Sequence, residues 1–210
     1  MEPIKLVVIA GAFNPVTVAH IHLGQLAKKR LPKARVVFVP AADSFLTSWK
    51  KLNDEDMFSA AERVKMLILG LEETDFYVNT CEVDGKVSGK TYDTLMYLVS
   101  KHGINKKDVY FMCGSDKLGE LEQWYQIEQL LKQFRLLVVG RAYENTKETV
   151  CENSFLHPYQ THIIILENDE QFQEISSTKV RQSLRIGDFE KVRQMIPETV
   201  YEYLVEKGVE

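Results

Sequence analysis

The sequence predicts an α/β fold: a doubly wound parallel sheet, followed by C-terminal helices, in a single domain over residues 1–210. The first observation behind this prediction is that short apolar runs rich in β-branched residues alternate with segments of helical periodicity. The second is that glycine turns follow the first and the fourth of these runs. The third is the composition, because 45% hydrophobic and 27% charged residues in a chain of 210 are typical of one globular unit.

Each apolar run predicts a strand, since β-branched residues favour extended backbone. The six expected strands cover residues 4–10, 35–40, 76–83, 108–113, 135–139 and 161–166. Apolar residues at helical spacing predict helices over residues 18–30, 61–71, 92–101, 120–132, 177–185, 189–195 and 199–207. Gly103 is expected to end the helix over residues 92–101. Residues 43–56 are expected to form an exposed loop, and residues 142–160 show no clear pattern.

Alternation of this kind implies right-handed crossovers between parallel strands, as in Rossmann-like folds. In that strand order the first and fourth strands are neighbours, and ligands bind where the order reverses between them. Gly11 follows the first expected strand and Gly114 follows the fourth. We therefore expect both turns to open into one crevice.

The stretch Gly11–His20 lies between the first expected strand and the first expected helix. A strand, a turn and a helix in this order present free backbone N–H groups to a phosphate. Gly11 allows a ligand to approach the backbone closely, although the three glycines of the common dinucleotide fingerprint are absent. His20, on the first turn of the expected helix, is placed to donate a hydrogen bond to a phosphoryl oxygen.

Residues 175–181, Ile-Ser-Ser-Thr-Lys-Val-Arg, form a second candidate phosphate site. Ser176 or Ser177 is a natural N-cap, and the N–H groups of a first helical turn favour an anion. Thr178 adds a hydroxyl group, and Arg181 adds a planar fork that matches phosphate oxygens. On the residues alone, an ordinary capped surface helix explains this segment as well.

The pattern Gly-x-Phe-x-Pro-x-Thr-x-x-His over residues 11–20 resembles the nucleotidyltransferase superfamily that carries an HxGH-type motif. It is most similar to the form found in nicotinamide or nicotinate mononucleotide adenylyltransferases, many of which have His at the position of Thr17. Residues 175–181 resemble the C-terminal ISSTxxR phosphate motif of that family. Gly114-Ser115-Asp116 with Trp124 resembles its GxD…W element, in which Asp binds the ATP ribose and Trp stacks on the pyridine ring.

The resemblance implies transfer of AMP from ATP to nicotinate or nicotinamide mononucleotide, which gives a dinucleotide and pyrophosphate in NAD biosynthesis. It implies His20 and Arg181 as catalytic residues, Mg²⁺ that arrives with ATP, and no protein-bound metal. The ATP-binding residues that it implies are Gly11, Ala12, Phe13, Thr17, His20, Gly114, Asp116, Ser177, Thr178 and Arg181. The mononucleotide-binding residues that it implies are Asn14, Lys50, Lys51, Thr91, Thr94 and Trp124.

Several alternatives stay open at this point. Thr91 and Thr94 could equally cap the helix that starts there, Asp116 and Trp124 could be a turn carboxylate and a core indole, and only one of Lys50 and Lys51 need bind phosphate. A sibling nucleotidyltransferase with phosphopantetheine, FMN or glycerol phosphate as its acceptor is the nearest rival function. A nucleotide-binding sensor without turnover is the rival from another class.

The net charge and the cysteine content limit which partners the protein is expected to bind and in which cellular compartment it is expected to act. A net charge of −4 gives no basic excess for a nucleic acid backbone. Cys81, Cys113 and Cys151 are widely spaced, which argues for a reducing compartment and against a disulfide framework. No apolar run approaches the ~20 residues of a membrane span. We expect a cytoplasmic protein that binds ATP and a pyridine mononucleotide, and a homo-oligomer is compatible with the sequence.

Overall fold

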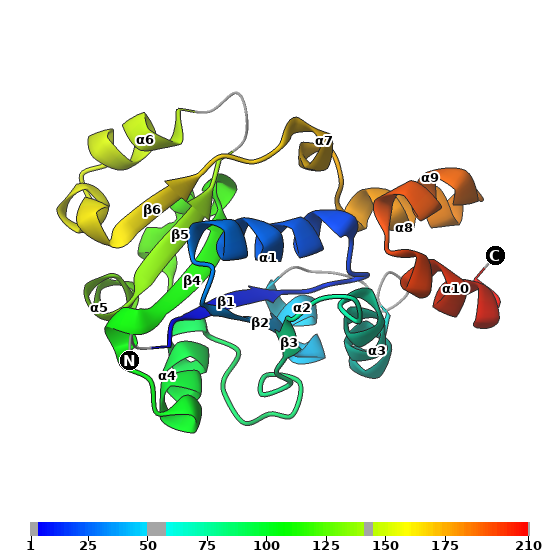
Figure 1. Ribbon diagram of the computed structural model, residues 1–210, viewed down its shortest axis with the longest axis horizontal. Coiled ribbons are helices and arrows are strands. Elements are labelled where there is room, and N and C mark those ends of the chain that lie inside the picture. Colours follow the sequence, from blue (N-terminus) through cyan, green and yellow to red (C-terminus); the bar gives the residue numbers. More distant parts are fainter. Residues whose placement is uncertain (1–3, 50–57, 141–144, 210) are drawn as a thin grey trace.

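A single sheet of six parallel strands forms the centre of the molecule (Figure 1). The structure, a computed structural model, describes residues 4–49, 58–140 and 145–209. The strand order is β3-β2-β1-β4-β5-β6, so the order reverses between β1 and β4, as predicted. The strands are β1 (Leu6–Gly11), β2 (Arg35–Pro40), β3 (Tyr77–Val78), β4 (Val109–Gly114), β5 (Arg135–Val139) and β6 (Ile163–Leu166).

Helices cover both faces of the sheet. The sequences of its central strands are therefore continuous apolar runs. Along β1, Val7 and Ile9 belong to one hydrophobic core, whereas Leu6 and Val8 belong to the other. The first core is covered by α1 (Val18–Arg30), α3 (Ala60–Gly70), α8 (Ser177–Arg185), α9 (Phe189–Met195) and α10 (Glu198–Glu206). The second is covered by α4 (Thr91–His102), the 3-10 segment η3 (Ser115–Gln123), α5 (Ile127–Gln133) and α6 (Thr146–Glu152).

Short elements complete the described chain. They are α2 (Asp43–Trp49), α7 (Glu170–Gln173) and the 3-10 segments η2 (Lys106–Asp108) and η4 (His157–His162). Gly103 ends α4 in the left-handed conformation at φ 61°, which confirms the predicted helix end. None of the helices in these described ranges is both long and apolar enough to cross a membrane.

Several predicted segments differ from the structure, and local side-chain contacts or backbone conformations explain the differences. The strand expected over residues 76–83 has only two residues, because the Asn79 side chain accepts a hydrogen bond from the Cys81 N–H (3.1 Å) and turns the chain away. The helix expected over residues 120–132 is divided into η3 and α5, because Gln126 has a left-handed backbone at φ 54°. Residues 142–160 contain α6, which begins at the N-cap Asn145.

The exposed loop expected over residues 43–56 is wrong in its first half, since Asp43–Trp49 is the helix α2. Leu46 on this helix is fully buried, so the segment packs against the fold and is not a solvated loop. The second half of that prediction, residues 50–56, lies outside the described residues.

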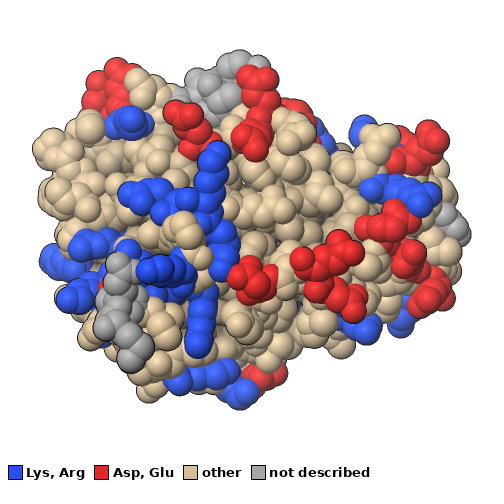
Figure 2. Space-filling view, in the orientation of Figure 1, with Lys and Arg blue, Asp and Glu red and all other residues tan. Residues whose placement is uncertain are grey.

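Basic and acidic side chains are separated on the face that Figure 2 shows. Lys and Arg gather towards the side where α1 ends, and Asp and Glu gather towards the C-terminal helices. The last turn of α1 carries Lys28, Lys29 and Arg30, which complement the negative end of the helix dipole. This basic cluster is therefore explained by helix stability and lies at the opposite end of α1 from the predicted phosphate turn.

Candidate active site

The turn between β1 and α1 is shaped by the buried side chain of Phe13. Phe13 has a left-handed backbone at φ 45°, which non-glycine residues rarely adopt. Its ring is 1% exposed and packs against His20 and Phe38, with ring centroids 5.1 and 5.6 Å apart. A Cβ atom at Gly11 would lie 3.3 Å from this ring, so the packing favours glycine at that position.

Arg63 of α3 ties this turn to the rest of the fold. Its side chain is fully buried, and Nη1 donates a hydrogen bond to the carbonyl oxygen of Ala12 (2.7 Å). Nη2 donates to the carbonyl oxygen of Ala41 (2.7 Å) and to Oδ1 of Asp43 (2.6 Å). One guanidinium group therefore connects the segments that follow β1 and β2 and the start of α2.

His20 is oriented by the residue that caps its own helix. The Thr17 N–H donates to Nδ1 of His20 (3.1 Å), and Thr17 Oγ1 lies 2.8 Å from the same nitrogen. Because Nδ1 accepts a hydrogen bond, the proton of the neutral ring is on Nε2. Thr17 is fully buried, so the structure gives it the task of orienting His20. Its predicted contact with ATP stays a prediction.

The start of α8 contacts the turn that precedes α1, although the two are far apart in sequence (Figure 1). Ser176 is the N-cap of α8, and Ser177 Oγ donates to the carbonyl oxygen of Pro15 (2.8 Å). Arg181 Nη1 donates to the carbonyl oxygen of Asn14 (2.7 Å), and burial lowers the pKa of Arg181. Thr178, on the same turn, is exposed. The two predicted phosphate motifs are therefore parts of one surface.

The end of β4 lies beside the end of β1, since Ile9 is opposite Met112 in the sheet. Asp116 follows Gly114 on the first turn of η3, and its side chain is exposed. A Cβ atom at Gly114 would lie 2.3 Å from Oδ1 of Asp116, so glycine lets this carboxylate fold back over the backbone. Asp116 is thus held at the edge of the sheet where the strand order reverses.

The predicted pyridine-binding residues lie on two elements that contact each other. Thr91 is the first residue of α4, and Trp124 follows η3, half-buried against Phe111 with ring centroids 5.9 Å apart. Lys90, immediately before α4, lies 4.2 Å from the ring centroid of Tyr125, and this contact joins the two segments. The N-cap of α4 is Lys90, without a side-chain capping bond, so the alternative that a threonine caps this helix is wrong.

Three further predicted mononucleotide residues are Asn14, Lys50 and Lys51. Asn14 is fully buried, and its Oδ1 accepts a hydrogen bond from the Phe58 N–H (2.9 Å), so its side chain is used within the fold. Lys50 and Lys51 lie outside the described residues. The structure therefore assigns neither lysine a role.

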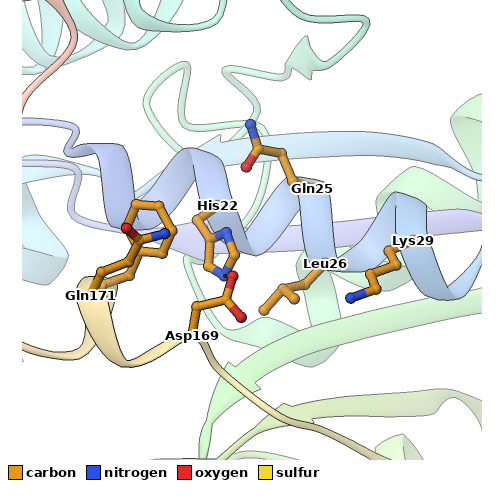
Figure 3. A pocket seen from close by; sticks show the side chains of 7 residues that line it. His22, Gln25, Leu26, Lys29, Asp169 and Gln171 are labelled. Carbon is orange, nitrogen blue, oxygen red and sulfur yellow. Dashed lines mark ion pairs between the residues drawn. The ribbon is translucent and has the colours of Figure 1, made fainter.

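A cavity of about 240 Å³ lies beside α1, apart from all of these residues (Figure 3). Its walls include His22, which stacks on Phe172 with ring centroids 4.0 Å apart and lies 3.4 Å from Oδ2 of Asp169. His22 therefore packs against α7, beside a cavity that none of the predicted phosphate-binding residues in the described ranges line. Across the described residues, no three His, Cys, Asp or Glu side chains are grouped as ligands of a metal ion.

A family model described as cytidylyltransferase-like matches residues 8–183. This chain belongs to the cytidylyltransferase-like family. A probable nicotinate-nucleotide adenylyltransferase of Clostridium perfringens is 31% identical over 88% of this chain and 90% of the relative. A protein of the same name from Listeria innocua is 30% identical over 96% of this chain and 95% of the relative. Another from Caldicellulosiruptor saccharolyticus is 28% identical over 98% of both.

Solved structures show the same fold as this cytidylyltransferase-like chain. The Plasmodium falciparum nicotinic acid mononucleotide adenylyltransferase complexed with NaAD aligns with a TM-score of 0.74 over 98% of this chain and 96% of that chain. The complex of that enzyme with APC gives a TM-score of 0.73 over 97% of this chain and 96% of that chain. Both are 17% identical to this chain, so the likeness concerns the fold. The Rossmann-like prediction is confirmed.

Two buried charged residues of this cytidylyltransferase-like chain were missed by reasoning from the sequence. Arg63 lies in α3 between the charged residues Glu62 and Lys65, so no local signal in the sequence distinguishes it as the buried one. Glu82 is 4% exposed and accepts a hydrogen bond from Thr94 Oγ1 (2.7 Å). Burial raises the pKa of Glu82 to about 7, although the bond from Thr94 opposes this change. Thr94, itself buried, therefore uses its hydroxyl group within the fold, and its predicted contact with the mononucleotide stays a prediction.

We expect Arg63→Met to lower the free energy of unfolding by about 2–4 kcal/mol, because three backbone or carboxylate acceptors lose their donor. Urea unfolding at neutral pH measures this loss. Arg193→Met is the matched control, since Arg193 is exposed and pairs with Glu198 at the surface. We expect its effect on stability to be much smaller, because an exposed ion pair is screened by solvent. A loss for Arg63→Met no greater than that for the control would contradict the role of the buried guanidinium.

We expect Glu82→Gln to change how stability depends on pH. The pKa of Glu82 is raised from 4.5 to about 7 on folding, so between these values the folded protein binds a proton that the unfolded chain does not. The contribution of Glu82 is therefore fully present below 4.5 and is lost as pH rises through about 7, by roughly 3 kcal/mol at most. Urea unfolding of both proteins between about pH 5 and pH 8 tests this. As pH rises, the wild type should lose more stability than the variant. Parallel curves of unfolding free energy against pH would contradict the proposed contribution of the buried Glu82.

Proposed function

We propose that this protein transfers AMP from ATP to nicotinate or nicotinamide mononucleotide, giving the dinucleotide and pyrophosphate for NAD biosynthesis, within a single domain over residues 1–210. One observation carries the proposal: Ser177 and Arg181 bond directly to the backbone of the turn that leads to His20. Two phosphate-type motifs that are separate in sequence thus converge on one surface. The names of the relatives in Clostridium perfringens and Listeria innocua support the choice of substrates.

The reaction that we propose is a direct displacement. A phosphate oxygen of the mononucleotide attacks the α-phosphorus of ATP, a new P–O bond forms, and pyrophosphate leaves from the opposite side. Catalysis then consists of positioning and of stabilising the charge that develops on the α-phosphate oxygens. His20 suits this task, because the hydrogen bond that Nδ1 accepts from Thr17 directs the ring proton to Nε2.

The remaining roles follow the placement of the residues. The backbone from Gly11 to Phe13 faces the phosphates, and Ser177, Thr178 and Arg181 hold the β and γ phosphates at the positive end of α8. Mg²⁺ is part of the ATP substrate, bound to its triphosphate, and neutralises charge on the leaving group. Asp116 accepts hydrogen bonds from the ribose. Thr91 and Trp124 line the pyridine site.

The cellular setting that we propose is the cytoplasm. All three cysteines of the chain are free thiols, and two of them are buried, which supports a reducing compartment. We propose no role for a nucleic acid or a membrane.

Pyrophosphate release from ATP tests the function and separates its rivals. Release with nicotinate or nicotinamide mononucleotide supports the proposal. Release only with phosphopantetheine, FMN or glycerol phosphate would identify a sibling nucleotidyltransferase. ATP binding without release on any of these acceptors would identify a sensor.

We expect His20→Ala to lower kcat by about 10²–10³-fold, the usual cost of losing one oxyanion donor. Thermal unfolding should shift by only a few degrees, because the substitution also removes half of the capping box of α1. His157→Ala, which changes an exposed histidine in η4, is the control and should keep the wild-type kcat. A folded His20→Ala protein with kcat within threefold of wild type would remove His20 from the mechanism.

A further inference from the structure

Lys90 lies at the junction of the two segments that line the predicted pyridine site. It directly precedes Thr91 on α4, and its Nζ is 4.2 Å from the ring centroid of Tyr125. Tyr125 in turn directly follows Trp124. The ammonium group is thus held over an aromatic ring, one residue from each of the two positions that we assign to the pyridine ring.

The charge of Lys90 is not neutralised by a carboxylate in the described parts of the chain. Nearby lysines differ in this respect. Lys86 forms an ion pair with Asp84 at 2.7 Å, and Lys117 forms one with Glu120 at 3.0 Å. Because a tyrosine ring offers only its electron-rich face, the ammonium group of Lys90 meets no anionic partner there and can turn its N–H donors to a ligand.

The two mononucleotides differ only in the group on the pyridine ring, which is a carboxylate in one and a neutral carboxamide in the other. If the ring stacks on Trp124, this group lies beside the residues that flank Trp124. An ammonium ion attracts a carboxylate more strongly than it attracts a neutral amide. A lysine held at this point therefore discriminates between the two substrates by charge.

We propose that Lys90 is a specificity-determining residue that makes this protein prefer nicotinate mononucleotide to nicotinamide mononucleotide. The inference rests on the proposed function and deepens it. Tyr125 positions the ammonium group through the face of its ring, and Lys90 contributes to binding of the acid without taking part in the displacement at phosphorus.

Steady-state kinetics with each mononucleotide test this inference in wild type, Lys90→Met, Lys90→Arg and Lys90→Glu. Lys90→Met should raise KM for the acid about tenfold with kcat unchanged, and should leave kcat/KM for the amide within about twofold. Lys90→Arg should keep most of the preference, and Lys90→Glu should reduce it further than Lys90→Met. Lys101→Met is the matched control, since Lys101 lies 5.9 Å from the ring centroid of Tyr97 at the other end of α4.

Each other outcome decides against the inference. Equal losses on both mononucleotides, no change with either, or a wild type that does not prefer the acid would overturn the role of Lys90 and leave the proposed function standing. A wild type that releases no pyrophosphate with either mononucleotide would overturn the proposed function and this inference together. Salt gives a second readout, because the acid preference of wild type should weaken as ionic strength rises, whereas that of Lys90→Met should not.

Discussion

The buried guanidinium group of Arg63 holds the backbone on which the candidate site is built. It bonds to the carbonyl oxygens of Ala12 and Ala41, at the ends of two neighbouring strands, and to the carboxylate of Asp43. Without these partners a buried charge would cost several kcal/mol, so Arg63 is stable only when both turns take this shape. The hydrogen bond from Arg63 to Ala12 therefore stabilises the shape of the turn after β1, and Arg63 need not touch a ligand to do so.

The chemistry that we propose depends on this fixed turn. Phe13, in its strained conformation, packs against the His20 ring, and Thr17 sets which ring nitrogen carries the proton. From the other side, Ser177 and Arg181 bond to carbonyl oxygens of the same turn. A preorganised arrangement of this kind suits a reaction in which the protein positions charge and forms no covalent bond. The predicted pyridine side, where Lys90 lies over the ring of Tyr125, is built on different elements, α4 and η3.

Local sequence patterns predicted the central strands well, because β1, β2, β4 and β5 are buried along most of their length and each contains a continuous apolar run. They failed where a contact joins distant segments. In α3, Arg63 is fully buried whereas Ile68 is 51% exposed, because the acceptors that Arg63 bonds to lie 51 and 22 residues away in the sequence. The motifs identified His20, Ser177 and Arg181 as candidate site residues. No sequence pattern, however, marks the carbonyl oxygens of Asn14 and Pro15, to which the side chains of α8 donate hydrogen bonds. The buried carboxyl of Glu82 escaped notice for the same reason.

A crystal structure of the protein with the dinucleotide product tests the central claim most directly. Our account predicts that the two phosphates of the dinucleotide lie beside the turn over residues 11–13 and the His20 Nε2 atom, with the pyridine ring against Trp124, whereas the first turn of α8 holds the part of ATP that leaves as pyrophosphate. The contacts of Arg63 with Ala12, Ala41 and Asp43 should be the same with and without the dinucleotide. A dinucleotide bound in the cavity beside His22, or phosphates without contact to His20, would contradict the account.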